Sequence, residues 1–274
     1  MATRKLNKKE AAAQLFRGAQ EYYAKYRPGI PAKVMDVIIR HFGVKRSDWV
    51  LDIGCGTGQV ALAMNGRIKE MVCFDPDPEM LKQARRATKK TKIKLIWINC
   101  GIQDLKKIKS NIGTFKIATI CRTFHWLNQK QVLKDLGAVI DDGGGVAIFG
   151  DSSIWTGTET WQAAVRGVVQ KYLGKQRRAG SGMFKQSEEP WEKVIVLSDF
   201  NNIKTRRVSV VRNWNVENII GWLLSSSFAR PDYFGKKLAD FKIDVRKVLL
   251  AMNSKGNFKE RAVFSIIMAS RERR

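Results

Sequence analysis

A glycine-rich loop between an apolar run and a helical pattern is the feature that most constrains this chain. The run WVLDIG at 49–54 is short and apolar, which predicts a buried strand, and 58–66 predicts a helix. The loop between them reads Asp52-Ile-Gly54-Cys-Gly56-Thr-Gly58. Glycines in such a turn adopt positive φ and let a ligand approach the backbone closely. We therefore expect a ligand site at this loop.

The segments after the loop alternate between apolar runs and helical patterns. Helices are predicted at 77–90, with Asp77 as N-cap, and at 128–139. Further strands are predicted at 71–75, 93–99, 115–121 and 145–150. Strands that alternate with helices form a parallel sheet covered on both faces, and right-handed crossovers make it doubly wound. A ligand should then bind at the carboxyl ends of the strands, where the strand order reverses.

The flanking segments are less regular. Helices are predicted at 7–25 and 31–42 before the loop, and at 158–173, 215–226 and 232–252 in the second half. The second half also holds a predicted loop at 174–189 and predicted strands at 203–212 and 260–269. These strands should complete a seven-stranded sheet whose last strand is antiparallel, and the remainder is too long for simple connections. The expected division is 1–150, N-terminal helices and core, and 151–274, helical lid insertions plus the last two strands.

Composition narrows the possible partners. Among 274 residues, 50 Lys and Arg stand against 25 Asp and Glu, a net charge of +25. Such a charge keeps nucleic acid as a possible partner, although a solvated basic surface is the favoured explanation of the charge.

No apolar run approaches the roughly 18 residues of a membrane span, and the first ten residues lack the pattern of a secretory signal. The four cysteines show no C-x-x-C spacing and only two histidines occur, so we expect reduced cysteines, no metal site and a cytoplasmic location.

The loop spacing selects among nucleotide ligands. The dinucleotide fingerprint G-x-G-x-x-G fails, because its third glycine would fall at Gln59, and no phosphate-binding P-loop sequence occurs. Asp75 ends the next predicted strand, 21 positions after Gly54. A carboxylate at this place can accept both hydroxyl groups of an adenosine ribose. An adenosine ligand that needs no pyrophosphate loop, such as S-adenosylmethionine, fits this pattern.

Four segments in order carry a resemblance: VLDIGCGTGQ, FDPDPEML, CGIQDL and ICRTFHWL. Together they resemble the class I S-adenosylmethionine-dependent methyltransferases, over about 25–150, which implies their Rossmann-like fold. YYAKYRPGIP and FHW look more narrowly like the small-molecule subgroup that contains trans-aconitate methyltransferase, although Ile30 stands where that subgroup usually has tyrosine. The second half resembles only uncharacterised members, through WLLSSSFARPDYFG, and fixes no substrate.

The resemblance implies a set of cofactor-binding residues. These are Tyr26, Arg27, Asp52, Gly54, Gly56, Gly58, Asp75, Pro76, Met80, Ile102, Gln103, Asp104, Cys121 and Arg122. The glycines would pack under the methionine part, Asp52 would orient the loop or meet the amino group, and Asp75 would hold the ribose. Either Gln103 or Asp104 would bond the adenine edge.

Methyl transfer from a sulfonium needs alignment, exclusion of water and, for some acceptors, a base. His125 is the candidate base, and the alternative is a packed wall formed by His125 with its neighbours. The substrate-binding candidates are Tyr22, Tyr23, Phe124, Trp126 and Trp155. The tyrosines could equally belong to an N-terminal helix packed on the core. The tryptophans of the second half, Trp155, Trp161, Trp191, Trp214 and Trp222, are expected in the lid.

The predicted function is methyl transfer from S-adenosylmethionine to a small-molecule acceptor, with S-adenosylhomocysteine as product. One alternative is an RNA methyltransferase that uses the basic surface. Against it, the place after the fourth strand reads CRTFHW rather than the N/D-P-P-Y tetrad of amino-directed nucleic-acid enzymes. The other alternative is a non-catalytic protein that binds the cofactor. The acceptor atom and the oligomeric state stay open.

Overall fold

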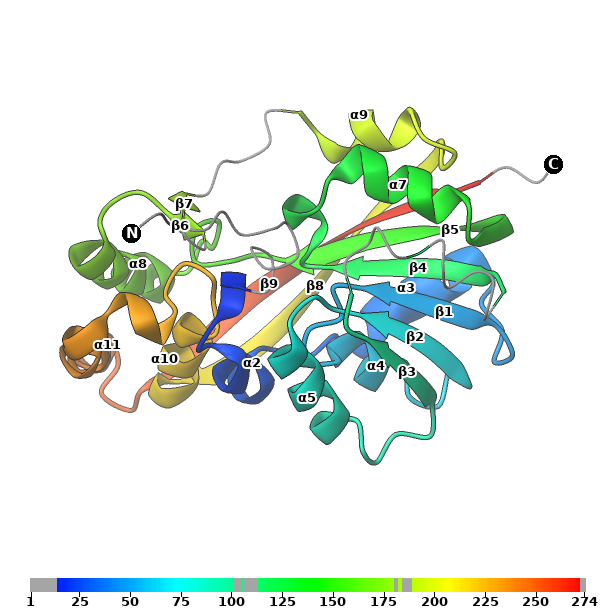
Figure 1. Ribbon diagram of the computed structural model, residues 1–274. Helices are drawn as coiled ribbons and strands as arrows, with labels where there is room; N and C mark the ends of the chain where they lie inside the picture. Colours follow the sequence, from blue (N-terminus) through cyan, green and yellow to red (C-terminus); the bar gives the residue numbers. More distant parts are fainter. Residues whose placement is uncertain (1–13, 101–104, 106–112, 180–181, 184–188, 272–274) are drawn as a thin grey trace, which may run out of the picture. The chain divides into compact units, whose positions relative to one another are not determined.

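The computed structural model describes residues 14–100, 105, 113–179, 182–183 and 189–271 (Figure 1). The chain divides into two compact units. The sheet unit comprises Gly29–Gly150, Ser187–Val208 and Phe264–Arg274. The helical unit comprises Met1–Pro28, Asp151–Gln186 and Ser209–Val263. One boundary between the units follows Gly150, where the sequence-based division also falls, whereas the segment before Gly29 groups with the helical unit.

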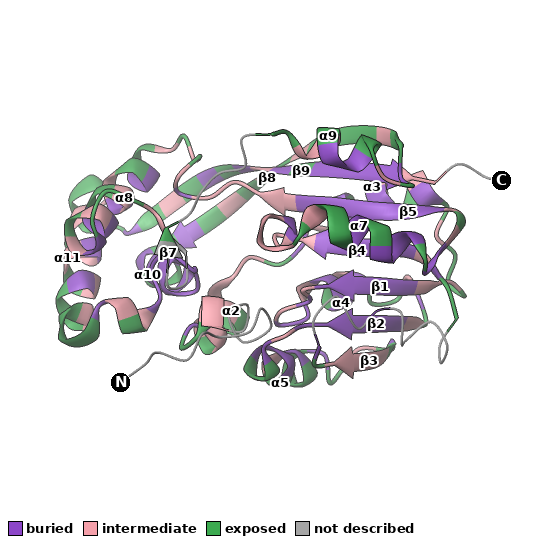
Figure 2. Cartoon of the chain, turned by 45° about the horizontal axis from the view of Figure 1, so that its top comes forward, coloured by how far each residue is buried: buried purple, intermediate pink, exposed green. Residues whose placement is uncertain are grey.

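The main sheet has seven strands in the order β3-β2-β1-β4-β5-β9-β8. Their bounds are β1 Trp49–Ile53, β2 Glu70–Phe74, β3 Lys94–Ile98, β4 Phe115–Cys121, β5 Ile140–Asp151, β8 Asn202–Asn215 and β9 Asn257–Ser270. Strands β1 to β5 pair in parallel, and β9 runs the opposite way (Figure 2). The predicted α/β sheet, mostly parallel with an antiparallel last strand, is confirmed. The strand order reverses between β1 and β4.

Among the elements whose bounds the structure describes, the helices of the sheet unit follow the predicted pattern with one addition. They are α3 Ala32–Phe42, α4 Gln59–Ala63, α5 Pro78–Ala87, α7 Gln129–Gly137 and α9 Trp191–Val196. Helix α5 begins as predicted, because the Asp77 carboxylate accepts the backbone N–H of Glu79 at 2.9 Å and of Met80 at 3.3 Å. Helix α9 was not predicted. Its Trp191 packs edge-on against Phe124 with ring centroids 5.3 Å apart, so the expectation that Trp191 lies in the lid is wrong.

Strands β1 and β2 are buried along almost their whole length, because helices cover both faces of the sheet (Figure 2). Their apolar side chains join those of β4, β5, α7 and α9 in one core cluster, which includes Leu51, Val72, Phe115, Ile148 and Ile195. This core fixes the carboxyl ends of β1, β2 and β4.

The helical unit has a core of its own. Its elements are η1 Gln14–Phe16, α2 Gln20–Tyr26, α8 Thr160–Leu173, α10 Val216–Leu224, η4 Pro231–Tyr233, η5 Gly235–Lys237 and α11 Leu238–Met252, together with parts of β8 and β9. Trp161, Trp214, Trp222 and Phe241 are buried in its core cluster. Helix α2 packs directly on α10, where a Cβ on Gly221 would lie 2.2 Å from the Tyr26 ring. Helix α2, which carries the three tyrosines, therefore packs on the core of the helical unit rather than on that of the sheet unit.

Three local expectations in this unit differ from the structure. Over its described residues, the helix predicted at 7–25 is a 3-10 turn, Gln14–Phe16, followed by α2 from Gln20. The segment predicted as a loop at 174–189 contains a short antiparallel pair, β6 Arg178–Ala179 and β7 Gly182–Met183. The helix predicted from 232 begins only at Leu238, because 3-10 turns occupy the preceding residues.

A buried ionic cluster holds the strands of the helical unit together. Arg212 lies 2.7 Å from a carboxylate oxygen of Asp151 and 3.4 Å from one of Glu260. The indole of Trp214 donates to Glu260 at 2.9 Å, and the amide of Gln162 donates to its other oxygen at 3.1 Å. Among the described residues, Arg212 is the only cation that the structure pairs with Glu260, so its removal would leave the buried Glu260 carboxylate without a paired cation.

Candidate functional site

The predicted loop lies at the reversal of strand order. It follows β1, whose neighbours are β2 on one side and β4 on the other. In open α/β sheets such a reversal leaves a crevice at the carboxyl ends of the strands, which is where ligands bind. The side chains that follow β1, β2 and β4 therefore converge on one edge of the sheet unit.

The glycine loop takes the left-handed conformation predicted for it. Gly54, Gly56 and Gly58 have φ of 68°, 52° and 80°. At Gly54 the backbone is also crowded, because an added Cβ would lie 2.4 Å from the Thr123 side chain. At Gly56 the same Cβ would meet no atom within 4 Å, so the loop leaves open space at this point. That combination of a fixed turn and an open side suits a bound ligand.

Asp75 ties the loop to the end of β2. One of its carboxylate oxygens accepts the Gly56 N–H at 2.8 Å and the other accepts the Asp77 N–H at 2.9 Å. Burial raises the pKa of Asp75 to about 7, because its effect is larger than that of these two hydrogen bonds, which lower the pKa. Each oxygen keeps a second lone pair, so the carboxylate can still accept the two hydroxyls of a ribose.

Asp52 is fully buried within β1, opposite Thr119 of β4. The Thr119 hydroxyl lies 2.7 Å from one carboxylate oxygen and can donate to it. Burial is the main cause that raises the pKa of Asp52 to about 7. Its other oxygen has no hydrogen-bond partner within the described part of the chain. A buried acceptor without a partner is typical of a position that a ligand donor completes.

The end of β4 approaches the loop through three consecutive residues. Thr123 donates its hydroxyl to the Cys121 carbonyl at 2.9 Å and contacts the Gly54 carbonyl at 3.3 Å. Arg122 has φ of 58°, the one positive value outside glycine in the described ranges. Its guanidinium donates to the Gln59 side chain at 3.0 Å, at the start of α4. Left-handed non-glycine residues cluster at functional sites, so this geometry agrees with a site here.

The segment after β4 forms the 3-10 helix η3, Phe124–Trp126. Phe124 is buried against Trp191 of α9 and therefore forms part of the core. His125 and Trp126 are half-buried, with ring centroids 4.5 Å apart. This contact is compatible with both interpretations of His125, as a base and as part of a packed wall.

The remaining predicted residues divide into three groups. Pro76 and Met80 lie in the sheet unit at the end of β2 and in α5, and Met80 is buried. Tyr22, Tyr23, Tyr26, Arg27 and Trp155 belong to the helical unit. Ile102, Gln103 and Asp104 lie outside the described residues.

Three polar residues of this edge escaped the sequence analysis. Thr119 and Thr123 have the contacts described above, and the Asn99 amide donates to the carbonyls of Asp75 and Pro76 at 3.1 and 3.0 Å. Thr119 could have been found as the polar residue inside the apolar run FKIATIC. Asn99 could have been found as the polar residue that ends the third predicted strand.

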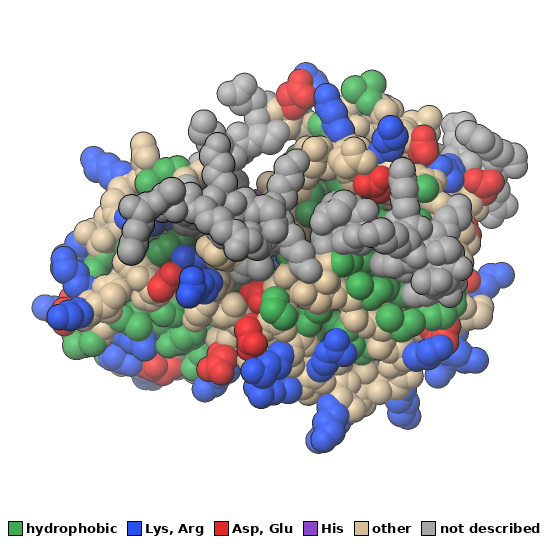
Figure 3. Space-filling model, in the orientation of Figure 1, with side chains coloured by type: hydrophobic (Ala, Val, Ile, Leu, Met, Phe, Trp, Pro, Cys, Tyr) green, Lys and Arg blue, Asp and Glu red, His purple; other side chains and the backbone are tan. Residues whose placement is uncertain are grey.

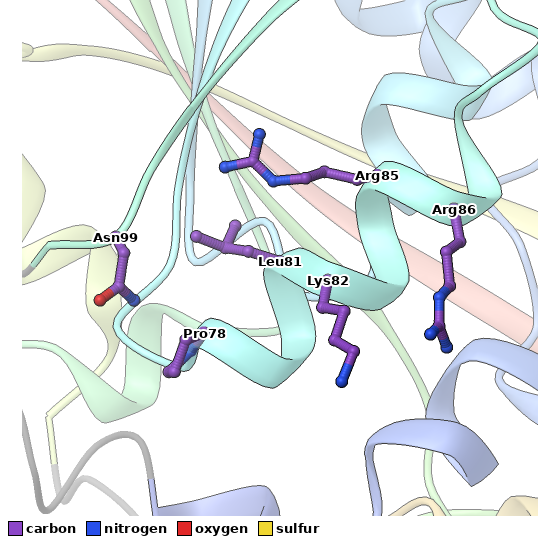
Figure 4. A pocket seen from close by; sticks show the side chains of 6 residues that line it. All are labelled: Pro78, Leu81, Lys82, Arg85, Arg86 and Asn99. Atoms are coloured by element: carbon purple, nitrogen blue, oxygen red, sulfur yellow. The ribbon is translucent and has the colours of Figure 1, made fainter.

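A surface hollow of about 400 Å³ lies beside the site on the outer face of α5 (Figure 4). It is lined by Pro78, Leu81, Lys82, Arg85, Arg86 and Asn99. None of these belongs to the predicted cofactor set, although Asn99 donates to the backbone of two members of that set.

On the face shown in Figure 3, Lys and Arg side chains are spread widely, with Asp and Glu among them rather than in one patch of a single sign.

The hydrogen-bonding groups at this edge of the sheet fit S-adenosylmethionine. Asp52 offers a partnerless acceptor oxygen that suits an amino group, Asp75 offers acceptors for ribose hydroxyls, and Gly56 leaves room for a ligand against the backbone. Across the described residues, no three or more His, Cys, Asp or Glu side chains gather as a metal site would require. No helix of the described chain is both long and apolar enough to cross a membrane.

Comparison with known proteins agrees with this geometry. Residues 50–144 match the methyltransferase domain family. A protein of Saccharomyces cerevisiae named as an S-adenosylmethionine-dependent methyltransferase is 27% identical over 131 residues, which are 47% of this chain and 44% of that protein. The chain thus spans less than half the length of this relative.

Solved structures show the same fold. A type II methyltransferase of Anaeromyxobacter dehalogenans superposes with a TM-score of 0.61 at 16% identity, over 91% of this chain and 100% of its own. A phosphoethanolamine N-methyltransferase of Haemonchus contortus, in complex with phosphomonomethylethanolamine and S-adenosylhomocysteine, gives 0.54 at 15% identity, over 98% of this chain and 61% of its own.

The domain match, the strand order and the loop geometry agree with one another. Residues 50–144 match the methyltransferase domain family. For this core, the comparisons support a class I methyltransferase that depends on S-adenosylmethionine.

Proposed function

We propose that this protein transfers the methyl group of S-adenosylmethionine to a small-molecule acceptor by in-line displacement, with the helical unit as a lid. The observation that carries the proposal is the arrangement of Asp52, Gly56 and Asp75 at the reversal of strand order. The second compact unit, which has a core of its own, is the proposed lid.

The residues of the sheet unit would hold the cofactor by distinct contacts. Asp75 accepts the ribose hydroxyls, Asp52 accepts from the amino group, and the glycine loop with Cys121 and Arg122 borders the methionine part. Tyr26 and Arg27 of the helical unit complete the proposed set. When bound, the cofactor supplies an electrophilic sulfonium methyl group. The chain's own task is then to align the acceptor atom with that methyl group and to exclude water.

His125 either takes a proton from the acceptor or only forms a wall with Trp126, and kinetics separate the two roles. With His125→Ala, a methyl-transfer rate within threefold of the wild-type rate excludes an essential base. A loss of about 100-fold or more, with unchanged affinity for S-adenosylhomocysteine, supports the base.

The proposed function is tested with S-adenosylmethionine that carries a labelled methyl group. The full chain is incubated with a total cell extract, and small metabolites, RNA and protein are separated before label is counted. We expect label in the small-molecule fraction, and less of it with Asp75→Ala, which removes the ribose contact and should weaken cofactor binding by about 1–3 kcal/mol. Label in RNA that nuclease abolishes would overturn the proposal and make the charge of +25 functional.

A further inference from the structure

The Thr119 hydroxyl lies between two acceptors at the middle of the sheet. Thr119 belongs to β4, is fully buried and stands opposite Asp52 of β1. Its hydroxyl oxygen lies 2.7 Å from one carboxylate oxygen of Asp52 and 3.2 Å from the Leu51 carbonyl oxygen. A hydroxyl has a single proton to donate and two lone pairs with which to accept. A well-aligned bond can therefore reach only one of these two acceptors at a time.

The choice of acceptor follows the protonation state of Asp52. When Asp52 is a carboxylate, the Thr119 hydroxyl donates to it, because a charged acceptor makes the stronger bond. When the same oxygen of Asp52 carries a proton, it can donate to the Thr119 oxygen, and the hydroxyl turns to donate to the Leu51 carbonyl. Neither state leaves a buried donor of this pair without an acceptor, so the pair tolerates both charges of Asp52.

No cation balances the charge of Asp52 among the described residues. The titratable groups that face it there are Asp75 at the end of β2, Cys73 in β2 and Cys55 in the glycine loop. Burial raises the pKa of both thiols, so they stay neutral near pH 7. Burial also raises the pKa of Asp52 to about 7, although the Thr119 hydrogen bond lowers it, and Asp75 raises it further. About half of the Asp52 carboxyls therefore carry a proton at pH 7.

The second oxygen of Asp52 offers a place for a cation. It is buried and has no hydrogen-bond partner within the described part of the chain. The proposed function gives this oxygen the amino group of the cofactor, which is positively charged near pH 7. A cation beside a carboxyl group favours its charged form, so the bound ammonium would drive the proton off Asp52. Thr119 would then donate to the other carboxylate oxygen and fix the orientation of the group.

We propose that Thr119 is a positioning residue for the cofactor, whose hydroxyl lets Asp52 release a proton when the amino group of S-adenosylmethionine binds. Asp52 loses one proton to the solvent and accepts a hydrogen bond from the ammonium, while the Thr119 hydroxyl turns from the Leu51 carbonyl to Asp52. This proposal rests on the proposed function in one respect, because it takes Asp52 as the acceptor of the amino group.

Two ligands test the proposal in the wild-type chain: S-adenosylhomocysteine and its desamino analogue, which lacks only the amino group. Each is titrated by calorimetry into the full chain at pH 7, in buffers of different ionisation enthalpy. The dependence of the measured heat on the buffer gives the number of protons released.

We expect S-adenosylhomocysteine to release about half a proton more than the analogue, because about half of the Asp52 carboxyls are protonated at this pH. The pKa of Asp75 is also raised to about 7 by burial, but both ligands carry the ribose, so any proton from Asp75 cancels in the difference. Equal proton release with the two ligands would overturn the proposal.

Variants assign the proton and the hydroxyl. Asp52→Asn has no proton to release, so the difference between the two ligands should vanish. Thr119→Val keeps the shape of the side chain without its hydroxyl. It should weaken S-adenosylhomocysteine about tenfold, leave the analogue unchanged and increase the difference in proton release toward one, because the bond that lowers the pKa of Asp52 is lost. Thr119→Ser should behave as the wild type.

Thr91→Val is the matched control. Thr91 is a half-buried threonine of the sheet unit whose hydroxyl donates to the Thr88 carbonyl at 2.8 Å, so this change should alter neither affinity nor proton release. Thr119→Cys takes the place of Thr119→Val if the latter fails to fold, because a thiol is only a weak donor.

A merely structural role of Thr119 predicts a different result. It would lower the affinity for both ligands alike and leave the difference in proton release at its wild-type value, and that outcome would overturn the proposal. The calorimetric test needs no methyl acceptor. The expected proton release together with methyl transfer to RNA would therefore support the role of Thr119 and overturn the proposed function alone.

Discussion

Replacement of Gly54 by alanine should be severely destabilising, for two separable reasons. The backbone has φ of 68°, where a non-glycine residue costs about 1–2 kcal/mol. The added Cβ would lie 2.4 Å from Thr123 Cγ2 and 2.9 Å from its hydroxyl oxygen, and overpacking of this kind costs about 1–3 kcal/mol. The sum is about 2–5 kcal/mol, a large part of a typical domain stability of about 5–15 kcal/mol.

Gly56→Ala is the matched control, because its φ is 52° and its Cβ would meet no atom within 4 Å. It should lose only the backbone contribution, about 1–2 kcal/mol. Thr123→Ser removes the nearest clashing methyl group and keeps the hydroxyl, so the double variant with Gly54→Ala should recover about 1 kcal/mol. Urea unfolding measures the free energy of unfolding of the wild type, of the two glycine variants and of the double variant. Equal losses in Gly54→Ala and Gly56→Ala would refute the argument.

Three further predictions concern stability. Burial raises the pKa of Asp52 and Asp75 to about 7, so both hold protons in the folded state that the unfolded state releases above about pH 4. The free energy of unfolding should therefore fall as pH rises from about 4 to 7, by up to about 1.4 kcal/mol per pH unit for each carboxyl, and Asp75→Asn should make the slope shallower. Asp77→Ala should cost about 1 kcal/mol in urea unfolding, through loss of the α5 cap, and no loss would exclude that role. Arg212→Met should cost about 3–5 kcal/mol by removing the cation that pairs with the buried Glu260 carboxylate, while exposed Arg207→Met should stay within about 0.5 kcal/mol in the same assay.

Local patterns predicted most of the elements because their cause is local. The apolar run FKIATIC predicted a strand at 115–121, and β4 spans Phe115–Cys121. Asp77 predicted the start of α5, since a capping carboxylate acts on the first turn alone. The loop was predicted for the same reason, because its three glycines, at every second position from 54 to 58, suit left-handed backbone conformations.

Strand β5 shows where local reasoning failed. The sequence predicted it from residue 145, but it begins at Ile140, with an irregular pairing against β4 between Phe115 and Ile117. The glycines at 143–145 made the first half of β5 look like a loop in the sequence, and a contact in the tertiary structure explains one of them. A Cβ on Gly145 would lie 2.3 Å from the Ala269 carbonyl of β9, a neighbour more than a hundred residues away in the chain.

The sequence by itself determined the class of fold, the glycine loop and the acidic residue after the second strand. Only the tertiary structure placed β4 beside β1, which brings Thr119 to Asp52 and Thr123 to Gly54. It also gathered Trp155, Arg177 and Phe228 from separate segments. The division has one physical reason. Backbone preferences and apolar periodicity act within a few residues, whereas strand order and side-chain contacts depend on which distant segments pack together.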